Sequence, residues 1–129
     1  MSTSITLLIV DGHPGVREAL LRRLQHVPRV GAVAAVGSIN AGVRLAQESV
    51  PDAVMYDPKT VAGDAAAAIR RLAAVGCPVV VLTSSLLEDE AAALARAGAA
   101  ALLLKGSSIA ELVSLIETVI AASAGTHPG

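Results

Sequence analysis

Aromatic residues are almost absent from this chain of 129 residues, which has no phenylalanine, no tryptophan and a single tyrosine, Tyr56. Hydrophobic residues nevertheless make up 53% of the sequence. Any core must therefore be packed mainly from Ala, Val, Leu and Ile side chains, which suit helices laid on a sheet of β-branched strands. The composition favours one α/β domain of ordinary size and excludes an intrinsically disordered chain.

Cysteine and charge are also scarce. The lone cysteine, Cys77, cannot form an internal disulfide, which agrees with a reducing cytosol. Charged residues make up 16% of the sequence and the net charge is −1, so the basic footprint of a DNA-binding domain is missing. The sequence shows neither an export signal nor an uncharged apolar run of the roughly 18 residues that a membrane span needs. We therefore expect a cytoplasmic domain that reaches DNA only through another segment or partner.

Short aliphatic runs recur along the chain, separated by segments with helical spacing. Runs of this length are typical of strands buried on both faces of a sheet. The alternation predicts a parallel sheet with right-handed crossovers. The expected fold is a doubly wound five-stranded parallel sheet with five helices, and its strands are expected at residues 5–10, 30–36, 53–56, 79–82 and 101–104.

Several helix ends are marked by residues that favour caps. Pro14 suits the first turn of a helix, where its missing N–H does no harm. The segments 85–88 and 108–111 both read Ser-x-x-Glu, which predicts a capping box at the start of each following helix. The first of these boxes precedes an expected helix over residues 91–97, and Gly98 follows as its C-terminal cap.

The last helical segment, residues 109–120, carries a broad apolar stripe. Part of that stripe is expected to cover the sheet, and part is available for pairing with a second copy. The residues after it, 121–129, are small and polar and are expected to fray. The predicted boundaries are a domain over residues 1–122 and a flexible tail over residues 123–129, which could begin a linker to an output domain.

Polar residues follow four of the five expected strands. Asp11 follows the first strand, Asp57 the third, Thr83 and Ser84 the fourth, and Lys105 the fifth. Ligands of doubly wound sheets bind beyond the carboxyl ends of the strands. Two carboxylates, a hydroxyl and an ammonium meeting at one edge would suit a carboxylate that accepts a phosphoryl group.

The motifs around these residues resemble the receiver domains of bacterial response regulators, in particular those of the NarL/FixJ group. Residues 7–20 resemble the opening of such receivers, in which two acids usually precede His-Pro. Residues 51–57 resemble the strand that carries the phosphoacceptor, and residues 81–84 and 102–108 resemble the later hydroxyl and lysine strands. The similarity spans nearly the whole chain in order and implies the flavodoxin-like receiver fold.

This resemblance implies a role for each strand-end residue. Asp57 would be the phosphoacceptor, Thr83 would hydrogen-bond the phosphoryl group, and Lys105 would pair with a phosphoryl oxygen. Asp11 and Asp57 would bind Mg²⁺. A sensor histidine kinase is the implied partner, a homodimer is expected, and DNA would be bound only through an output domain absent from this chain. We expect no enzyme, because no P-loop, dinucleotide fingerprint or nucleophile–base pair appears.

The chain departs from the family pattern at the second acid, where Gly12 stands. Glycine has no side chain with which to ligate a cation. Because Mg²⁺ requires near-octahedral oxygen coordination and loses water reluctantly, the missing carboxylate should weaken its binding markedly. Mg²⁺ is therefore a doubtful cofactor here.

The segment after the phosphoacceptor is a second departure. Residues 58–63 lack the Met-Pro-Gly pattern common in such receivers and look shortened, and Pro58 restricts the backbone of the residue before it. We hypothesise that the Lys59 ammonium replaces part of the missing metal charge beside Asp57. Leu102 occupies the place, three residues before Lys105, where an aromatic side chain often reports phosphorylation.

Each of the strand-end residues also has a purely structural interpretation. Asp11 and Asp57 could be strand-end acids that accept backbone N–H groups, Thr83 an ordinary strand residue, and Lys105 a solvated lysine.

Other polar or reactive residues are expected to have structural roles. Tyr56 should face the opposite side of the sheet from Asp57 and pack there. Cys77 is expected to be a small buried hydrophobic residue rather than a redox centre. His13 is expected in the loop before the first helix, and the pair Arg22 and Arg23 on a solvated helix face.

The leading hypothesis is a receiver domain of a transcriptional response regulator in which phosphorylation of Asp57 is weak or absent. The alternative is a small-molecule-binding or dimerisation module on the same fold that works without phosphorylation. In that case Gly12, Gly63 and Gly106 would make room for a ligand at the strand ends.

Overall fold

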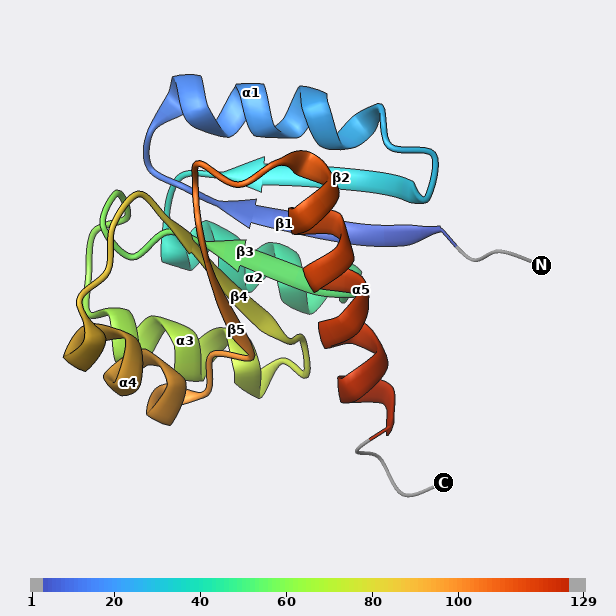
Figure 1. Ribbon diagram of the computed structural model, residues 1–129. Coiled ribbons are helices and arrows are strands. Elements are labelled where there is room, and N and C mark those ends of the chain that lie inside the picture. Colours follow the sequence, from blue (N-terminus) through green and yellow to red (C-terminus); the bar gives the residue numbers. More distant parts are fainter. Residues whose placement is uncertain (1–3, 126–129) are drawn as a thin grey trace.

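The computed structural model describes residues 4–125, in which five strands alternate with five helices (Figure 1). The strands are β1 (Ile5–Val10), β2 (Val30–Val36), β3 (Ala53–Tyr56), β4 (Val79–Thr83) and β5 (Ala101–Leu104). The helices are α1 (Pro14–Gln25), α2 (Ile39–Ser49), α3 (Ala65–Ala74), α4 (Glu88–Ala97) and α5 (Ile109–Gly125). The predicted strands are confirmed, with one added residue at the end of β4.

All neighbouring strands pair in parallel, and their order in the sheet is β2-β1-β3-β4-β5. The chain moves outward from β1 to β2, then crosses back to β3 and continues to β5. The direction of winding therefore reverses between β1 and β3, which is the switch point where ligands bind in such sheets. The predicted doubly wound architecture is confirmed.

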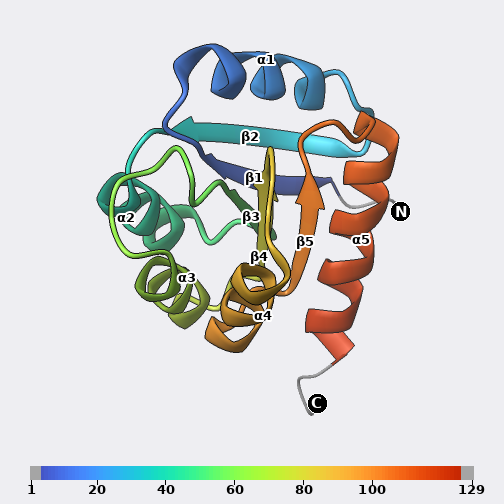
Figure 2. The ribbon, with the colours of Figure 1, turned by 60° about the vertical axis from the view of Figure 1, so that its left-hand side comes forward.

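Helices cover both faces of the sheet (Figures 1 and 2). α2, α3 and α4 pack on one face, and α1 and α5 pack on the other. Alternate strand residues enter opposite cores, as shown by Leu8 and Val10 in the first and Leu7 and Ile9 in the second. This alternation follows from the two-residue period of a strand and sets the face on which each strand-end side chain emerges.

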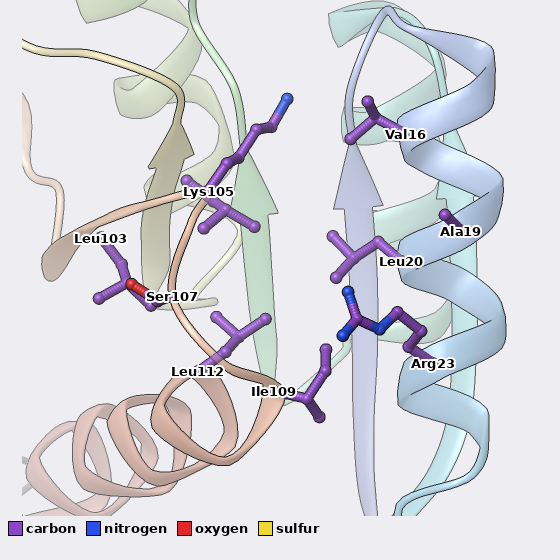
Figure 3. A pocket seen from close by; sticks show the side chains of 10 residues that line it. Val16, Ala19, Leu20, Arg23, Leu103, Lys105, Ser107, Ile109 and Leu112 are labelled. Atoms are coloured by element: carbon purple, nitrogen blue, oxygen red, sulfur yellow. The ribbon is translucent and has the colours of Figure 1, made fainter.

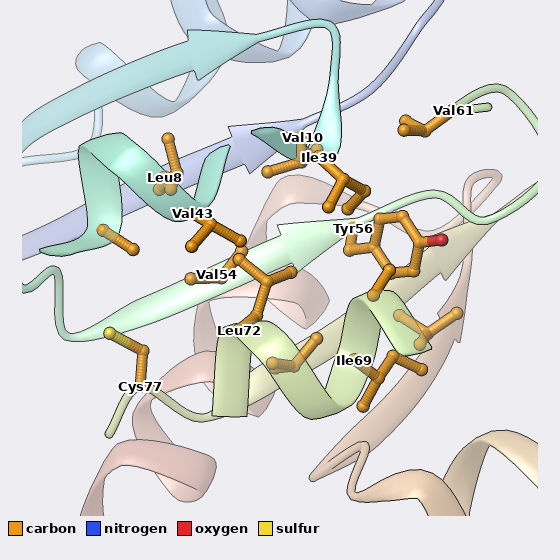
Figure 4. Close-up of a cluster of buried hydrophobic side chains, with 14 of the residues drawn as sticks. Leu8, Val10, Ile39, Val43, Val54, Tyr56, Val61, Ile69, Leu72 and Cys77 are labelled. Carbon is orange, nitrogen blue, oxygen red and sulfur yellow. The ribbon is translucent and has the colours of Figure 1, made fainter. Parts of the chain in front are cut away.

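The single aromatic ring lies in the core under α2 and α3. Tyr56 packs there with Val61 and Ile69, and Cys77 lies in the same cluster (Figure 4). Both side chains are therefore packing residues, as predicted. Burial raises the pKa of Tyr56 to about 12, and the nearby charges of Asp57 and Asp64 add to this effect.

Most predicted helix ends are confirmed. Pro14 is the first residue of α1. Gly98 ends α4 with a left-handed φ of 119°, a conformation that glycine adopts at little cost. The Ser108–Glu111 box caps α5, since the Ser108 hydroxyl accepts from the Glu111 N–H at 3.1 Å and the Glu111 carboxylate accepts from the Ser108 N–H at 3.2 Å.

The predicted capping box at residues 85–88 is wrong. α4 begins at Glu88, three residues before the expected start, and the Glu90 carboxylate accepts the N–H of Leu87 at 2.9 Å. The three consecutive acids Glu88, Asp89 and Glu90 therefore all lie in the first turn. Negative charge is favourable there because of the helix dipole, which explains the earlier start.

The last helix is longer than predicted. α5 continues to Gly125, so residues 121–125 are helical rather than frayed, and the remainder of the predicted tail, residues 126–129, lies outside the described residues. The apolar stripe on α5 packs against the sheet, with Leu112, Val113 and Ile116 buried. Within the described residues, no helix is both long and apolar enough to cross a membrane.

Candidate functional site

Three charged residues meet at the carboxyl edge of the sheet. Asp11, Asp57 and Lys105 directly follow strands β1, β3 and β5. The side chain two residues before each of them packs in the core under α1 and α5, namely Ile9, Met55 and Leu103. Because alternate strand residues share a face, all three charged side chains emerge on the same side of the sheet. The predicted convergence is confirmed for this trio.

Lys105 bridges the two carboxylates. Its Nζ lies 2.6 Å from Asp11 Oδ2 and 2.5 Å from Asp57 Oδ2. Both aspartates are 2% exposed, and the lysine side chain is 18% exposed. Two buried carboxylates at this range repel each other unless a cation lies between them. The ammonium supplies that cation, so Lys105 is not an ordinary solvated lysine.

The charge on Lys105 is fixed by its partners. Burial by itself lowers the pKa of Lys105, but hydrogen bonds from the ammonium to Asp11 and Asp57 and the charges of those carboxylates together outweigh burial. The pKa of Lys105 is therefore raised above its ordinary value. The Lys105 ammonium therefore stays charged at neutral pH.

The remaining carboxylate oxygens also have donors within the protein. Asp57 Oδ1 accepts the N–H of Lys59 at 2.8 Å. Asp11 Oδ1 accepts the N–H of His13 at 2.8 Å and the hydroxyl of Thr60 at 3.1 Å. The interpretation of these acids as acceptors of backbone N–H groups is thus correct but incomplete, because every carboxylate oxygen of the pair is hydrogen-bonded.

Thr60 closes the pocket at the place where the second acid is expected. Its hydroxyl accepts the N–H of Gly12 at 3.0 Å. A Cβ built on Gly12 would lie 1.8 Å from the carbonyl oxygen of Thr60, a distance that no real contact allows. The loop after β3 therefore occupies the space in which a side chain at position 12 would begin. Gly12 is required by this close approach and provides no room for a ligand.

Sequence reasoning missed Thr60 entirely. Its only signal was the unusual segment after Asp57, which pointed to a changed loop without saying where the loop would lie. Arg17 was missed as well: its guanidinium donates to the Asp11 carbonyl oxygen at 2.7 Å and holds the backbone between β1 and α1. His13 lies before α1, as predicted, and caps it, since its Nδ1 accepts the N–H of Val16 at 3.2 Å.

Thr83 lies at the end of β4 but does not join the trio. Its side chain is 1% exposed, and within the described part of the chain its hydroxyl has no hydrogen-bond partner. Only its backbone is linked to the site, through the carbonyl oxygen that accepts the N–H of Lys105 at 2.8 Å. Contact between the Thr83 hydroxyl and a phosphoryl group stays a prediction.

The predicted role of Lys59 is wrong. Its ammonium lies 3.6 Å from Glu90 Oε1 and 3.5 Å from Ser85 Oγ, so it points to α4 rather than to Asp57. The backbone N–H of Lys59 already donates to Asp57 Oδ1, and the acidic first turn of α4 attracts the Lys59 ammonium away from the site. The cation that balances the aspartates is Lys105.

The family model of the response regulator receiver domain matches residues 7–117 of this chain. The chain belongs to this family. No curated protein matches it.

Solved receivers resemble the chain over nearly its whole length. A two-component response regulator of the LuxR family from Aurantimonas is 28% identical, with a TM-score of 0.83, over 93% of this chain and 87% of that one. The receiver domain of the putative response regulator NarL from Mycobacterium tuberculosis is 21% identical, with a TM-score of 0.84, over 92% and 98%. A putative response regulator from Chloroflexus aurantiacus is 26% identical, with a TM-score of 0.79, over 92% and 99%. The flavodoxin-like receiver fold is thereby confirmed.

Receiver domains typically bind Mg²⁺ in their acidic pocket, but the residues present here do not fit this ion. Every oxygen of Asp11 and Asp57 already accepts a protein donor, and the backbone of Thr60 fills the space where a side chain at position 12 would begin. Over residues 4–125, no cluster of three His, Cys, Asp or Glu side chains could hold a metal ion. An ammonium this close to both carboxylates also repels a divalent cation at the same oxygens.

We predict that Lys105→Met lowers the free energy of unfolding at neutral pH by about 3–5 kcal/mol, because it leaves two buried carboxylates without a cation. Lys59→Met is the matched control and should cost less than about 1 kcal/mol, since its ion pair with Glu90 is exposed. Urea denaturation measures both. Equal losses in the two variants would contradict the bridge.

A second prediction concerns Gly12. Gly12→Ala should destabilise the fold by about 1–3 kcal/mol because its Cβ meets the carbonyl of Thr60, which is backbone and must shift. Gly106→Ala meets no atom within 4 Å and should change stability by less than about 0.5 kcal/mol. Gly12→Asp carries the same Cβ, so it should also destabilise and leave the Mg²⁺ affinity unchanged in a calorimetric titration. A stable Gly12→Asp protein that binds Mg²⁺ tightly would show that the loop is not the obstacle.

Proposed function

We propose that this chain is the input domain of a transcriptional response regulator in which phosphorylation of Asp57 is weak or absent. Membership of the receiver family supports the input role. The observation that carries the second part is the Lys105 ammonium held between Asp11 and Asp57, with Thr60 closing the pocket beside them.

The arrangement disfavours attack by Asp57 on a phosphoryl donor. The carboxylate is 2% exposed, and each of its oxygens is hydrogen-bonded, one to Lys105 and one to the Lys59 N–H. A nucleophile whose lone pairs accept hydrogen bonds is less reactive. The doubly charged phosphoryl group would then add negative charge where one ammonium already serves two carboxylates.

The output and the partners are inferred from relatives. The similar structures from Aurantimonas and Staphylococcus aureus are named as LuxR-family regulators, the second as a DNA-binding response regulator. By analogy, we assign DNA binding to an output domain outside this chain, a sensor histidine kinase as the upstream partner, and the cytoplasm as the location. A homodimer is also proposed.

Phosphorylation by acetyl phosphate in the presence of Mg²⁺ tests the proposal, with the intact mass of the protein as the readout. We expect little or no added phosphoryl mass in the wild-type chain and the same low level in Asp57→Ala. Rapid and stable addition of one phosphoryl group that disappears in Asp57→Ala would contradict the impaired pocket.

A further inference from the structure

A cavity of about 260 Å³ lies between α1, the end of β5 and the start of α5 (Figure 3). It opens on the sheet face opposite to α2, α3 and α4. Ala19 lines it from α1, and this small side chain leaves space that a larger residue would fill. The rest of the lining is mostly aliphatic, with Val16, Leu20, Leu82, Leu103, Ile109 and Leu112.

Two cations and no acid line this cavity. They are Lys105 and Arg23. The Lys105 ammonium is held by the two aspartates, so only its methylene stem is available to the cavity. The Arg23 guanidinium forms no hydrogen bond or ion pair with any residue that the structure describes. In Figure 3 its guanidinium extends from α1 across the space beside Leu20 and Ile109.

The neighbouring arginine is differently placed. Arg22 lies 3.8 Å from Glu18 on the exposed side of α1 and does not line the cavity. Both arginines are exposed, as predicted from the sequence, but only Arg23 lines the cavity. An apolar hollow with one unpaired positive charge is complementary to a ligand with an apolar body and one negative charge.

We infer that this cavity binds a small amphipathic monoanion, of the class of medium-chain carboxylates. The carboxylate pairs with the Arg23 guanidinium, and the hydrocarbon chain lies over Leu20, Leu103 and the stem of Lys105. The volume lies just below the range of about 300–1,000 Å³ for drug-sized ligands, which limits the ligand to a compact one. A single free cation limits it to one negative charge.

The position of the cavity gives such binding a regulatory consequence. Lys105 forms part of its lining and also bridges Asp11 and Asp57. A ligand packed on the lysine stem therefore acts on the residue that organises the aspartate pair, and it serves as an input that needs no phosphorylation. This consequence rests on the proposed function, whereas binding itself does not.

Titration of the ¹⁵N-labelled chain with octanoate, followed by amide chemical shifts, tests the inference. We expect saturable shifts at the cavity residues, and at least about tenfold weaker binding of the uncharged octanamide, because a charge-assisted pair is lost. Arg23→Gln should weaken octanoate binding about tenfold. Arg22→Gln is the matched control on the same helix and should leave the affinity unchanged. Ala19→Leu should abolish binding by filling the space.

Several results would overturn the inference. They are the absence of saturable shifts at the cavity, equal affinity for octanoate and octanamide, and equal effects of Arg22→Gln and Arg23→Gln. Self-association of the chain that Ala19→Leu disrupts would instead assign the cavity to an interface between copies. Arg23 is exposed, so Arg23→Gln tests the site even if Ala19→Leu does not fold. The acetyl phosphate experiment reads Asp57 alone, so failure of either proposal is visible without the other.

Discussion

The ammonium of Lys105 between two buried carboxylates is the interaction on which the site depends. The parallel sheet brings Asp11 and Asp57 to neighbouring strand ends beside the switch point, where their charges repel. Lys105 arrives from β5, which is separated from β3 by β4. Its two short ion pairs therefore connect the end of β5 to the paired ends of β1 and β3, and the ammonium balances one of the two carboxylate charges.

The second feature of the pocket is the close contact between Gly12 and Thr60. Position 12 differs from the family pattern by more than the loss of an acid. The backbone of the loop after β3 lies in the space that a side chain at this position would need. The Thr60 hydroxyl then serves both the Gly12 N–H and Asp11. The two segments thus support each other, because the glycine leaves the space that the Thr60 backbone occupies and its N–H donates to the Thr60 hydroxyl.

Much of this arrangement could be predicted from the sequence, because it follows from strand ends and alternation. The aliphatic runs located the strands, and the residues just after them identified Asp11, Asp57 and Lys105. Alternation along β3 also placed Tyr56 on the opposite face from Asp57. These features depend on local periodicity and on the edge at which parallel strands end.

Other features depend on packing between distant segments and escaped prediction. Thr60 gains its role only from its distance to Gly12, and the direction of the Lys59 side chain is set by Glu90 on another helix. α2 ends on Val50 in a left-handed conformation with φ of 42°, which its side chain disfavours and no pattern indicates. The cavity beside Arg23 arises from the spacing of α1 and α5, which the sequence of neither helix specifies.

A crystal structure of the chain grown in excess Mg²⁺ is the most direct test of the pocket. Lys105 is predicted to remain between Asp11 and Asp57, with the Thr60 carbonyl against Gly12 and no metal on either carboxylate. A six-coordinate Mg²⁺ bound to Asp11 and Asp57, with Lys105 turned away, would contradict the central role of the ammonium.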